Sequence, residues 1–128
     1  MKEFKYDRAG NFEEAGKLLK GNANARPIAG GTDLLGTIKK EILCETPQVP
    51  VDLKKIPGSK GIKAEGDSVS IGALTTLTEI AESTDIREKA PILAEAAYSV
   101  ATPLIRNMGT IGGNLCQDVR CWFYRYPH

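Results

Sequence analysis

Two glycine-rich stretches give this sequence its clearest capacity to bind a ligand. The first runs Ile28-Ala-Gly-Gly-Thr-Asp-Leu-Leu and lies between an apolar run and a helical pattern. Paired glycines at such a junction let the backbone approach a ligand closely, and the amide groups at a helix start point toward an anion. The nucleotide fingerprints G-x-G-x-x-G and G-x-x-x-x-G-K-S/T are absent, and Asp33 competes with an incoming phosphate. Taken alone, the stretch favours a tight strand-to-helix turn with a positive φ over a phosphate site.

The second stretch, Arg106-Asn-Met-Gly-Thr-Ile-Gly-Gly-Asn, combines glycines with a hydroxyl, an amide and a cation. Its backbone N–H groups can wrap a pyrophosphate while Thr110 and Asn114 add side-chain hydrogen bonds. A hairpin or a bulge corner explains the same residues equally well. Two phosphate-competent stretches on different subdomains favour a dinucleotide laid across a cleft, because pockets commonly form where domains meet.

The pattern around the first stretch predicts a small α/β subdomain over residues 1–54. Residues 3–6, 26–29 and 49–53 have the composition of short strands. Two helical patterns separate these runs, and the connections are short. Strands that alternate with helices in this way indicate a mostly parallel sheet.

Capping residues support both helices of this subdomain. Asn11 is a good N-cap with acidic residues in the turn that follows, and Gly21 is a good stop for that helix. Thr32 can cap the second helix. The apolar residues expected on its inner face are Leu34, Leu35, Ile38 and Ile42.

The sequence pattern changes after a turn-rich joint, and residues 55–128 are predicted to form a second subdomain. Two alternating runs within residues 61–72 flank Gly66-Asp67 and predict a hairpin. Helical patterns follow over residues 77–82 and 90–98, and the second glycine-rich stretch then forms a loop. This subdomain contains only part of a sheet, which indicates that it is incomplete.

Composition excludes several function classes. The net charge is +1, so the chain has no electrostatic footprint for nucleic acid or an anionic membrane surface. No apolar run is long enough to span a bilayer. The charged N-terminus has no apolar segment of a secretory signal, and three cysteines make a poor disulfide framework. These features predict a cytoplasmic protein of the reducing compartment.

The titratable residues offer no hydrolytic constellation. The single histidine is His128, so no Ser-His pair with a buried carboxylate can form inside the fold. Asp33, Asp52 and Glu79 are interpreted as caps and solvated carboxylates. Any chemistry is therefore expected to come from a cofactor.

The end of the chain carries an unusual share of aromatic residues. Trp122, Phe123, Tyr124 and Tyr126 are four of the eight aromatic residues and lie within the last seven positions. Because termini are usually polar, these side chains predict either a continuation of the chain or a partner. Self-association of this segment through its aromatic residues is a further expectation.

Two cysteines near the end allow more than one interpretation. Cys116 is most simply a small buried hydrophobic residue. Together, Cys116, Cys121 and His128 could hold zinc, although their spacing is unusual for a zinc site.

Three motifs occur in the order in which one flavoprotein family carries them. They are Ala29-Gly-Gly-Thr-Asp-Leu-Leu, Ile71-Gly-Ala-Leu-Thr-Thr-Leu and Ile105-Arg-Asn-Met-Gly-Thr-Ile-Gly-Gly-Asn. Together they resemble the FAD-binding subunit of molybdenum hydroxylases, which include xanthine dehydrogenase, carbon monoxide dehydrogenase and 4-hydroxybenzoyl-CoA reductase. The resemblance implies an α+β fold of the p-cresol methylhydroxylase type, with a small βαβαβ subdomain followed by an incomplete antiparallel-sheet subdomain with helices. Complete subunits are much longer, so it also implies that this chain is an N-terminal fragment.

The resemblance further implies which residues bind FAD. It places the pyrophosphate on the first glycine-rich stretch and on Thr110–Asn114, with Leu74–Thr76 near the flavin. The expected cofactor-binding residues are Ala29, Gly30, Gly31, Thr32, Asp33, Leu34, Leu35, Thr76, Thr110, Ile111, Gly112, Gly113 and Asn114. No residue is expected to be catalytic, because the redox chemistry belongs to the flavin.

The resemblance also implies partners and a second cofactor. The parent enzyme would pass electrons between a molybdenum-cofactor subunit, a 2Fe-2S subunit and this flavin, which exchanges them with an external carrier. The segment around Cys121 resembles the branch that includes 4-hydroxybenzoyl-CoA reductase, in which a cysteine-rich insertion holds an extra 4Fe-4S cluster. Cys121 would be its first ligand, and only the intact subunit could complete it. The alternative is a folded, truncated fragment without bound FAD and without activity of its own.

Overall fold

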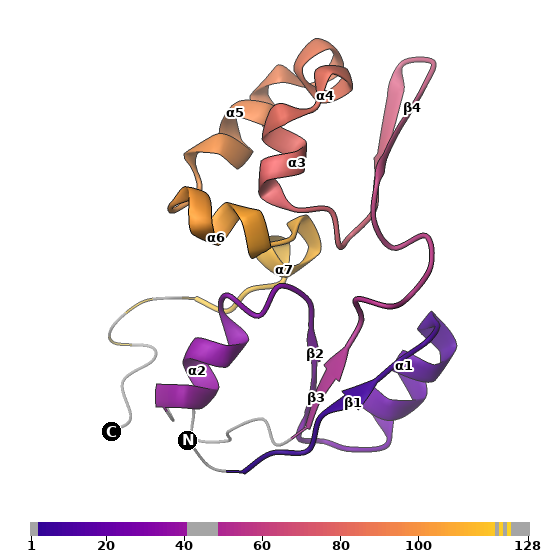
Figure 1. Ribbon diagram of the computed structural model, residues 1–128, viewed down its shortest axis with the longest axis vertical. Helices are drawn as coiled ribbons and strands as arrows, with labels where there is room; N and C mark the ends of the chain where they lie inside the picture. The colour runs from indigo at the N-terminus through magenta and orange to yellow at the C-terminus, as the bar shows by residue number, and fades with distance from the viewer. Residues whose placement is uncertain (1–2, 41–48, 120, 122, 124–128) are drawn as a thin grey trace. The chain divides into compact units, whose positions relative to one another are not determined.

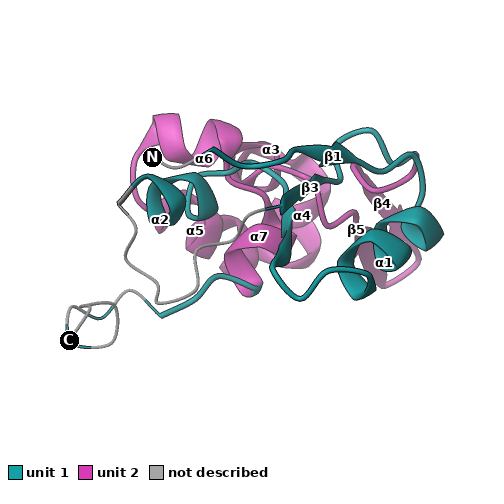
Figure 2. Cartoon of the chain, turned by 90° about the horizontal axis from the view of Figure 1, so that it is seen from below, with its two compact units in different colours: residues 1–57, 116–128 teal, residues 58–115 magenta. Residues whose placement is uncertain are grey.

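The computed structural model describes residues 3–40, 49–119, 121 and 123 (Figure 1). The chain divides into two compact units, residues 1–57 with 116–128 and residues 58–115 (Figure 2). The division follows Pro57, and residues from Cys116 onward group with the first unit rather than with the second, to which the sequence-based boundaries assign them. None of the helices among the described residues is both long enough and apolar enough to cross a membrane.

The sheet of the first unit consists of β1 (Asp7–Arg8), β2 (Ala25–Ile28) and β3 (Val49–Asp52), in the order β1-β3-β2. Both pairs are parallel, and Asp52 at the end of β3 lies opposite Arg8 and Ile28. The carboxyl ends of the strands therefore share one edge of the sheet, and the first glycine-rich stretch begins there. The mostly parallel arrangement predicted from the sequence is confirmed.

The first strand lies later in the sequence than predicted. Residues 7–8, rather than residues 3–6, pair with β3. The alternation of Phe4 and Tyr6 suggested a strand, but the Tyr6 side chain is 41% exposed. Tyr6 instead donates a hydrogen bond from its hydroxyl to Asp52 Oδ2 at 2.7 Å. A tertiary hydrogen bond, and not ladder pairing, therefore fixes this residue.

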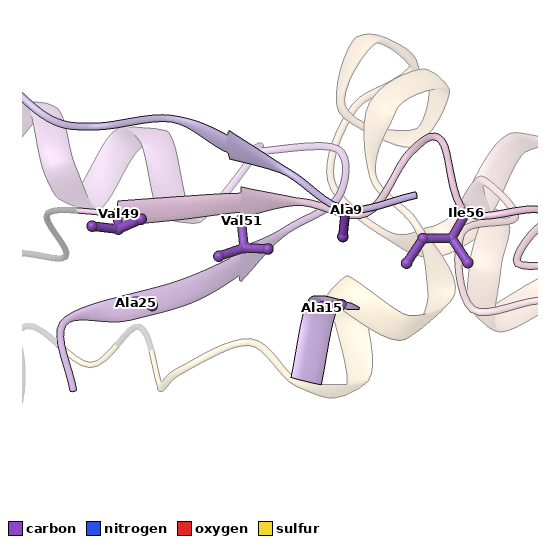
Figure 3. Close-up of a cluster of buried hydrophobic side chains, with 6 residues drawn as sticks. All are labelled: Ala9, Ala15, Ala25, Val49, Val51 and Ile56. Atoms are coloured by element: carbon purple, nitrogen blue, oxygen red, sulfur yellow. The ribbon is translucent and has the colours of Figure 1, made fainter. Parts of the chain in front are cut away.

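Helix α1 (Phe12–Lys20) forms as its capping residues predict. The Asn11 side chain accepts a hydrogen bond from the Glu14 amide, and the helix ends at Gly21, whose amide donates to the Lys17 carbonyl. Its buried residue, Ala15, packs in a cluster with Ala9, Ala25, Val49, Val51 and Ile56 (Figure 3). The small alanines of this cluster let helix and strands approach closely.

Helix α2 (Leu34–Lys40) differs from the prediction at its start and on its inner face. Asp33, and not Thr32, directly precedes the first helical residue. Ile38 is buried as expected, whereas Leu35 is 37% exposed. Ile42, the remaining residue of the predicted inner face, lies outside the described residues. The buried positions are Thr37 and Ile38, so the inner face includes a polar residue that an apolar pattern does not reveal.

The second unit opens with the predicted hairpin. Strands β4 (Ile62–Glu65) and β5 (Ser68–Ile71) pair antiparallel, and Gly66 in the turn has a φ of 55°. A left-handed residue in a two-residue turn matches the twist of the flanking strands.

Helices complete the second unit. They are α3 (Leu77–Glu82), α4 (Thr84–Lys89), α5 (Pro91–Ser99), α6 (Pro103–Met108) and α7 (Ile111–Leu115). Helices α3 and α5 were predicted, while α4, α6 and α7 were not. Side-chain caps from Ser83 and Thr102 start α4 and α6.

The core of the second unit joins these helices to one another. Its buried members are Leu77, Ile80, Ala81, Ile86, Ala94 and Ala97, with Ile62, Val69 and Ile71 of the hairpin packed against them. Helix α3 supplies three of these buried residues, including the completely buried Ile80. The same helix begins next to one of the sequence motifs, so the core fixes the position of that motif.

Candidate functional site

The first glycine-rich stretch connects β2 to α2 through a backbone that requires glycine. Gly31 has a φ of 74°, in the left-handed region that L side chains rarely adopt. A Cβ at this position would lie 2.9 Å from Leu35 Cδ1 and 3.2 Å from Leu35 Cγ. The expected positive-φ turn is therefore present, and the absence of a side chain keeps the backbone accessible from the carboxyl edge of the sheet.

The carbonyls and the amides of this stretch are used differently. The Gly31 carbonyl accepts from the Leu35 amide at 3.1 Å, and the Asp33 carbonyl accepts from both the amide and the hydroxyl of Thr37 at 3.1 Å. The amides of Gly30, Gly31 and Thr32 have no hydrogen-bond acceptor within the described part of the chain. Successive free amides around a left-handed residue form a concavity that suits an anion.

A buried carboxylate lies at the same edge of the sheet. Asp52 is 4% exposed, and its Oδ1 accepts from the Lys54 amide and from the Lys54 ammonium, each at 2.9 Å. The Tyr6 hydroxyl donates to the other oxygen. The interpretation of Asp52 as a solvated carboxylate is therefore wrong, because its fixed donors allow it to be buried in ionised form.

These contacts set the ionisation of the pair. Burial raises the pKa of Asp52, but the hydrogen bonds from Lys54 and Tyr6 together outweigh burial and hold it below its ordinary value. Burial likewise lowers the pKa of Lys54, and the hydrogen bond and negative charge of Asp52 outweigh it, so that this pKa is raised. Both groups are therefore charged around neutral pH.

Lys54 also reaches the first glycine-rich stretch. Its ammonium donates to the Ala29 carbonyl at 3.3 Å, and its side chain remains 49% exposed. Sequence reasoning missed this residue. The available signal was a lysine two positions after an acidic residue at the carboxyl end of a parallel strand.

The second glycine-rich stretch is built into the fold of its unit. Thr110 forms an antiparallel bridge with Thr76, and the Ile111 amide donates to the Thr75 carbonyl at 2.9 Å. The Gly112 amide donates to the Ala73 carbonyl at 2.8 Å. A Cβ on Gly112 would lie 2.8 Å from that same carbonyl oxygen, so this glycine is required by close backbone packing.

The sequence-based description of this stretch as an open loop, a hairpin or a bulge corner is wrong. After the bridge at Thr110 the chain enters α7, and Thr110 caps that turn by accepting from the Gly113 amide at its hydroxyl and from the Asn114 amide at its carbonyl. The amides of residues 111–114 all donate inside the unit, so they are not free donors here. The Asn114 carboxamide has no protein partner within the described residues.

Arg106, expected as the cation of this stretch, is engaged elsewhere. Its guanidinium donates to the carbonyls of Val100 at 2.9 Å and Ala101 at 3.4 Å, and it lies 4.9 Å from the centre of the Tyr98 ring. Ala101 has a φ of 45°, and the arginine closes this strained turn between α5 and α6. The cation noted in this stretch is therefore engaged within the protein.

The Leu74–Thr76 segment is a structural junction. Leu74 and Thr75 are buried, and the Thr75 hydroxyl both accepts from the Gly61 amide and donates to the Gly61 carbonyl. The amide and hydroxyl of Thr76 donate to Glu79 Oε2 in the capping box that starts α3. The side chain of Thr76 is thus already bonded within the protein.

Glu79 connects this junction to the segment before the hairpin. Its Oε1 lies 2.9 Å from Lys60 Nζ. Burial raises the pKa of Glu79, but the hydrogen bonds from Thr76 and Lys60 outweigh burial and lower it below the ordinary value. The capping role expected for Glu79 is confirmed.

The described part of the chain end is exposed. Cys116 and Cys121 are both exposed free thiols, so the interpretation of Cys116 as a buried hydrophobic residue is wrong. Phe123 is 86% exposed. No cluster of three potential metal ligands occurs among the described residues, and His128 lies outside them, as do Trp122, Tyr124 and Tyr126.

Comparison with known proteins identifies the family. Residues 2–120 match the family described as "FAD binding domain in molybdopterin dehydrogenase". The chain belongs to this family. The molybdopterin dehydrogenase assignment confirms the resemblance drawn from the three sequence motifs, and with it the α+β fold of the FAD-binding domain.

Relatives of known activity support the assignment. The chain is 38% identical over 111 residues to the glyceraldehyde dehydrogenase medium chain of Sulfolobus acidocaldarius, covering 87% of this chain. It is 42% identical over 117 residues to the nicotinate dehydrogenase FAD-subunit of Eubacterium barkeri, covering 90% of this chain. In both comparisons the match spans 39% of the relative's own length.

Solved structures share the same fold. Carbon monoxide dehydrogenase from Hydrogenophaga pseudoflava superposes with a TM-score of 0.83 at 36% identity, covering 89% of this chain and 39% of that chain. Quinoline 2-oxidoreductase from Pseudomonas putida 86 superposes with a TM-score of 0.81 at 30% identity, covering 90% and 40%. The molybdopterin dehydrogenase FAD-domain fold is therefore established for this chain.

Proposed function

We propose that this chain is the FAD-binding segment of a molybdenum-hydroxylase-type oxidoreductase subunit. The observation that carries the proposal is the free amide array of Gly30, Gly31 and Thr32 at the carboxyl edge of a parallel sheet, in a chain that matches an FAD-binding family over residues 2–120. In the proposed site the first stretch, Ala29–Leu35, binds the pyrophosphate through these amides. Thr110–Asn114 contributes the Asn114 carboxamide, and Thr76 lies near the flavin.

The chain's residues bind and orient the cofactor and carry out no bond chemistry themselves. When bound, the flavin supplies the redox chemistry, taking electrons from iron–sulfur clusters and exchanging them with an external carrier. In the proposed assembly a molybdenum-cofactor subunit and a 2Fe-2S subunit are the partners, as the sequence resemblance implies. The relatives named as medium chains of dehydrogenases and the molybdenum cofactor of the Hydrogenophaga pseudoflava carbon monoxide dehydrogenase support a multi-subunit assembly. We place this assembly in the cytoplasm, because the sequence offers no disulfide framework.

Titration of the purified chain with FAD tests the proposal, with flavin fluorescence and absorbance as readouts. Gly31→Ala should lower FAD affinity by about tenfold or more, because a Cβ strains the left-handed backbone and displaces Leu35. Gly36→Ala is the matched control, since nothing lies within 4 Å of a Cβ there. Equal FAD affinity of both variants and the unaltered chain would contradict the assigned pyrophosphate site.

A second candidate is a folded fragment that binds no FAD on its own. The match spans 39% of the curated relatives' length, and a ligand site that buries its ligand from several sides loses affinity when part of its lining is missing. A colourless chain with native circular dichroism and no fluorescence change on FAD addition supports this candidate. A yellow chain that retains FAD through gel filtration excludes it.

We further propose that Cys121 ligates a 4Fe-4S cluster in the intact subunit. The support is the resemblance of its segment to the cluster-bearing branch, and its exposed thiol. Cys121→Ser in the intact subunit should remove four-iron content while FAD stays bound, whereas Cys116→Ser should remove none. Iron and sulfide analysis decides between these outcomes, and unchanged iron in Cys121→Ser refutes the assignment.

A further inference from the structure

We propose that Lys54 is a positioning residue for the flavin site, holding the Ala29 carbonyl, and with it the Gly30–Gly31 backbone, against the buried Asp52 carboxylate. This inference rests on the proposed FAD function, because it assigns Lys54 to the same glycine-rich stretch. Lys54 would act through the backbone of that stretch and would not itself take part in the redox chemistry.

The fixed point of this arrangement is Asp52. Its carboxylate is at the end of the central strand β3, and the Tyr6 hydroxyl holds one oxygen at 2.7 Å while the Lys54 amide holds the other at 2.9 Å. Neighbouring strands on both sides pair with the residue, which opposes Arg8 in β1 and Ile28 in β2. A carboxylate restrained in this way can hold a partner cation in one place.

The Lys54 ammonium extends from this fixed point to the glycine-rich stretch. It lies 2.9 Å from Asp52 Oδ1 and donates to the Ala29 carbonyl at 3.3 Å. Ala29 directly precedes the glycines whose amides are free, so its carbonyl orientation fixes the first peptide plane of the amide array. The Lys54 contact therefore acts on the part of the stretch that meets the ligand.

Two backbone hydrogen bonds within the described part of the chain flank these residues. Before the stretch, the Leu53 amide donates to the Ile28 carbonyl at 3.2 Å, and after it the Leu35 amide donates to the Gly31 carbonyl at 3.1 Å. Between these points, Lys54 supplies a side-chain hydrogen bond to the backbone. A stretch ordered before binding loses less conformational entropy when the ligand arrives, so removal of the contact weakens binding without touching the ligand.

The test uses Lys54→Met, which removes the cation and keeps a similar chain length. Lys55→Met is the matched control, because it makes the same change at an exposed neighbour with no ion pair among the described residues. Lys54→Arg tests for rescue, because it restores a cation at this position. Backbone ¹⁵N relaxation of the ligand-free chain is measured first, then FAD affinity by fluorescence titration and stability by urea unfolding.

We expect Lys54→Met to lower the ¹⁵N order parameters of the amides at residues 30–33 and to bind FAD about tenfold more weakly. Order parameters at residues 111–114 should be unchanged, and Lys54→Arg should recover part of both effects. A purely structural ion pair would instead lower the free energy of unfolding without a selective change at residues 30–33.

The outcomes separate this inference from the proposed function. If Lys54→Met and Lys55→Met show the same ¹⁵N order parameters at residues 30–33, the positioning role is refuted whether or not FAD binds. If the order parameters of these residues fall selectively but FAD does not bind to the unaltered chain, the contact with the stretch is supported and the proposed function fails. If the order parameters fall but FAD affinity does not, the stretch is held by Lys54 for a reason unrelated to the flavin, and the inference is overturned.

Discussion

The two glycine-rich stretches are held in place by different kinds of contact. Residues 29–33 of the first unit depend on a lysine side chain and a buried carboxylate, and several of their amides have no partner in the described chain. Residues 109–114 of the second unit are held by backbone hydrogen bonds to residues 73–77, and the amides of residues 111–114 donate inside the protein. A stretch held by side chains responds to ionisation, whereas one held by backbone responds mainly to an added Cβ.

The largest effect is expected from an added side chain in the backbone-held stretch. Gly112→Ala should lower the free energy of unfolding by about 2 kcal/mol, because its Cβ would lie 2.8 Å from the Ala73 carbonyl oxygen and 2.9 Å from the Ala73 Cβ. Urea unfolding measures this change. Gly113→Ala, whose nearest contact is the Thr110 hydroxyl at 3.0 Å, should have a smaller effect. Equal losses would show that the two glycines are not packed as described.

Removal of the buried charge should have the next largest effect. Asp52→Asn should lower the free energy of unfolding by about 2 kcal/mol or slightly less, because Lys54 and Tyr6 lose their charged acceptor. Glu79→Gln, at a side chain that is 43% exposed, should lose less than about 1 kcal/mol. Urea unfolding of both variants at neutral pH provides the comparison. A larger loss for Glu79→Gln would reverse the relative importance assigned to these carboxylates.

The same carboxylates predict how stability depends on pH. The pKa values of Asp52 and Glu79 lie below their ordinary values of 3.8 and 4.5. A carboxyl group whose pKa is lower in the folded than in the unfolded state adds stability. This stability is fully present above the pKa of the unfolded state and is lost as the pH falls through the pKa of the folded state. The free energy of unfolding should therefore fall below about pH 5, and less steeply in Asp52→Asn. An acid titration of unfolding with the same slope in both proteins would refute the role of Asp52.

The pKa of Lys54 gives the matching prediction in alkali. This pKa is raised above its ordinary value of 10.5. The contribution of the Lys54 ammonium to stability is therefore present below that pH and is lost as the pH rises through the pKa of the folded state. Asp52→Asn should remove much of this alkaline dependence as well, since Asp52 is the group that raises the pKa. Unfolding measured toward strongly alkaline pH tests it.

The smallest effect is expected at the chain end. Cys116 is exposed, so Cys116→Ala should change the free energy of unfolding by less than about 0.5 kcal/mol, and not by the larger amount that a buried thiol would give. Ile80→Ala, at a completely buried side chain, should lower the free energy of unfolding by more than about 2 kcal/mol. Comparable losses at the two positions would mean that Cys116 is covered in solution.

Much of the fold could be predicted because its signals are local. Asn11 and Gly21 bound α1, and Gly66 marks the hairpin turn, through contacts within a few residues. The shift of the first strand from residues 3–6 to Asp7–Arg8 could not be predicted. It depends on pairing with Val51 and Asp52 and on the Tyr6–Asp52 hydrogen bond, which are tertiary contacts.

The features of the candidate site likewise fall into local ones, which could be predicted, and tertiary ones, which could not. The left-handed Gly31 follows from its residue type and position, and the family motifs point to the same stretch. Sequence reasoning could not show that the Arg106 guanidinium turns to the Val100 carbonyl, or that the Ile111 amide is already bonded to Thr75. The contact of Lys54 with Ala29 was also hidden, because the two residues meet only when neighbouring strands pair.

The pairing pattern of the two units has a consequence for the order of folding. Strands β4 and β5 are joined by a tight turn, and hairpins of this kind form in about 1–10 μs. The sheet of the first unit instead pairs Asp7 with Val51 and Ala25 with Val49, so long chain segments must close before any hydrogen bond forms. We therefore expect residues 58–115 to acquire their structure first. Residues 29–33 should become fixed last, once the chain beyond β3 has brought Lys54 into reach of Ala29.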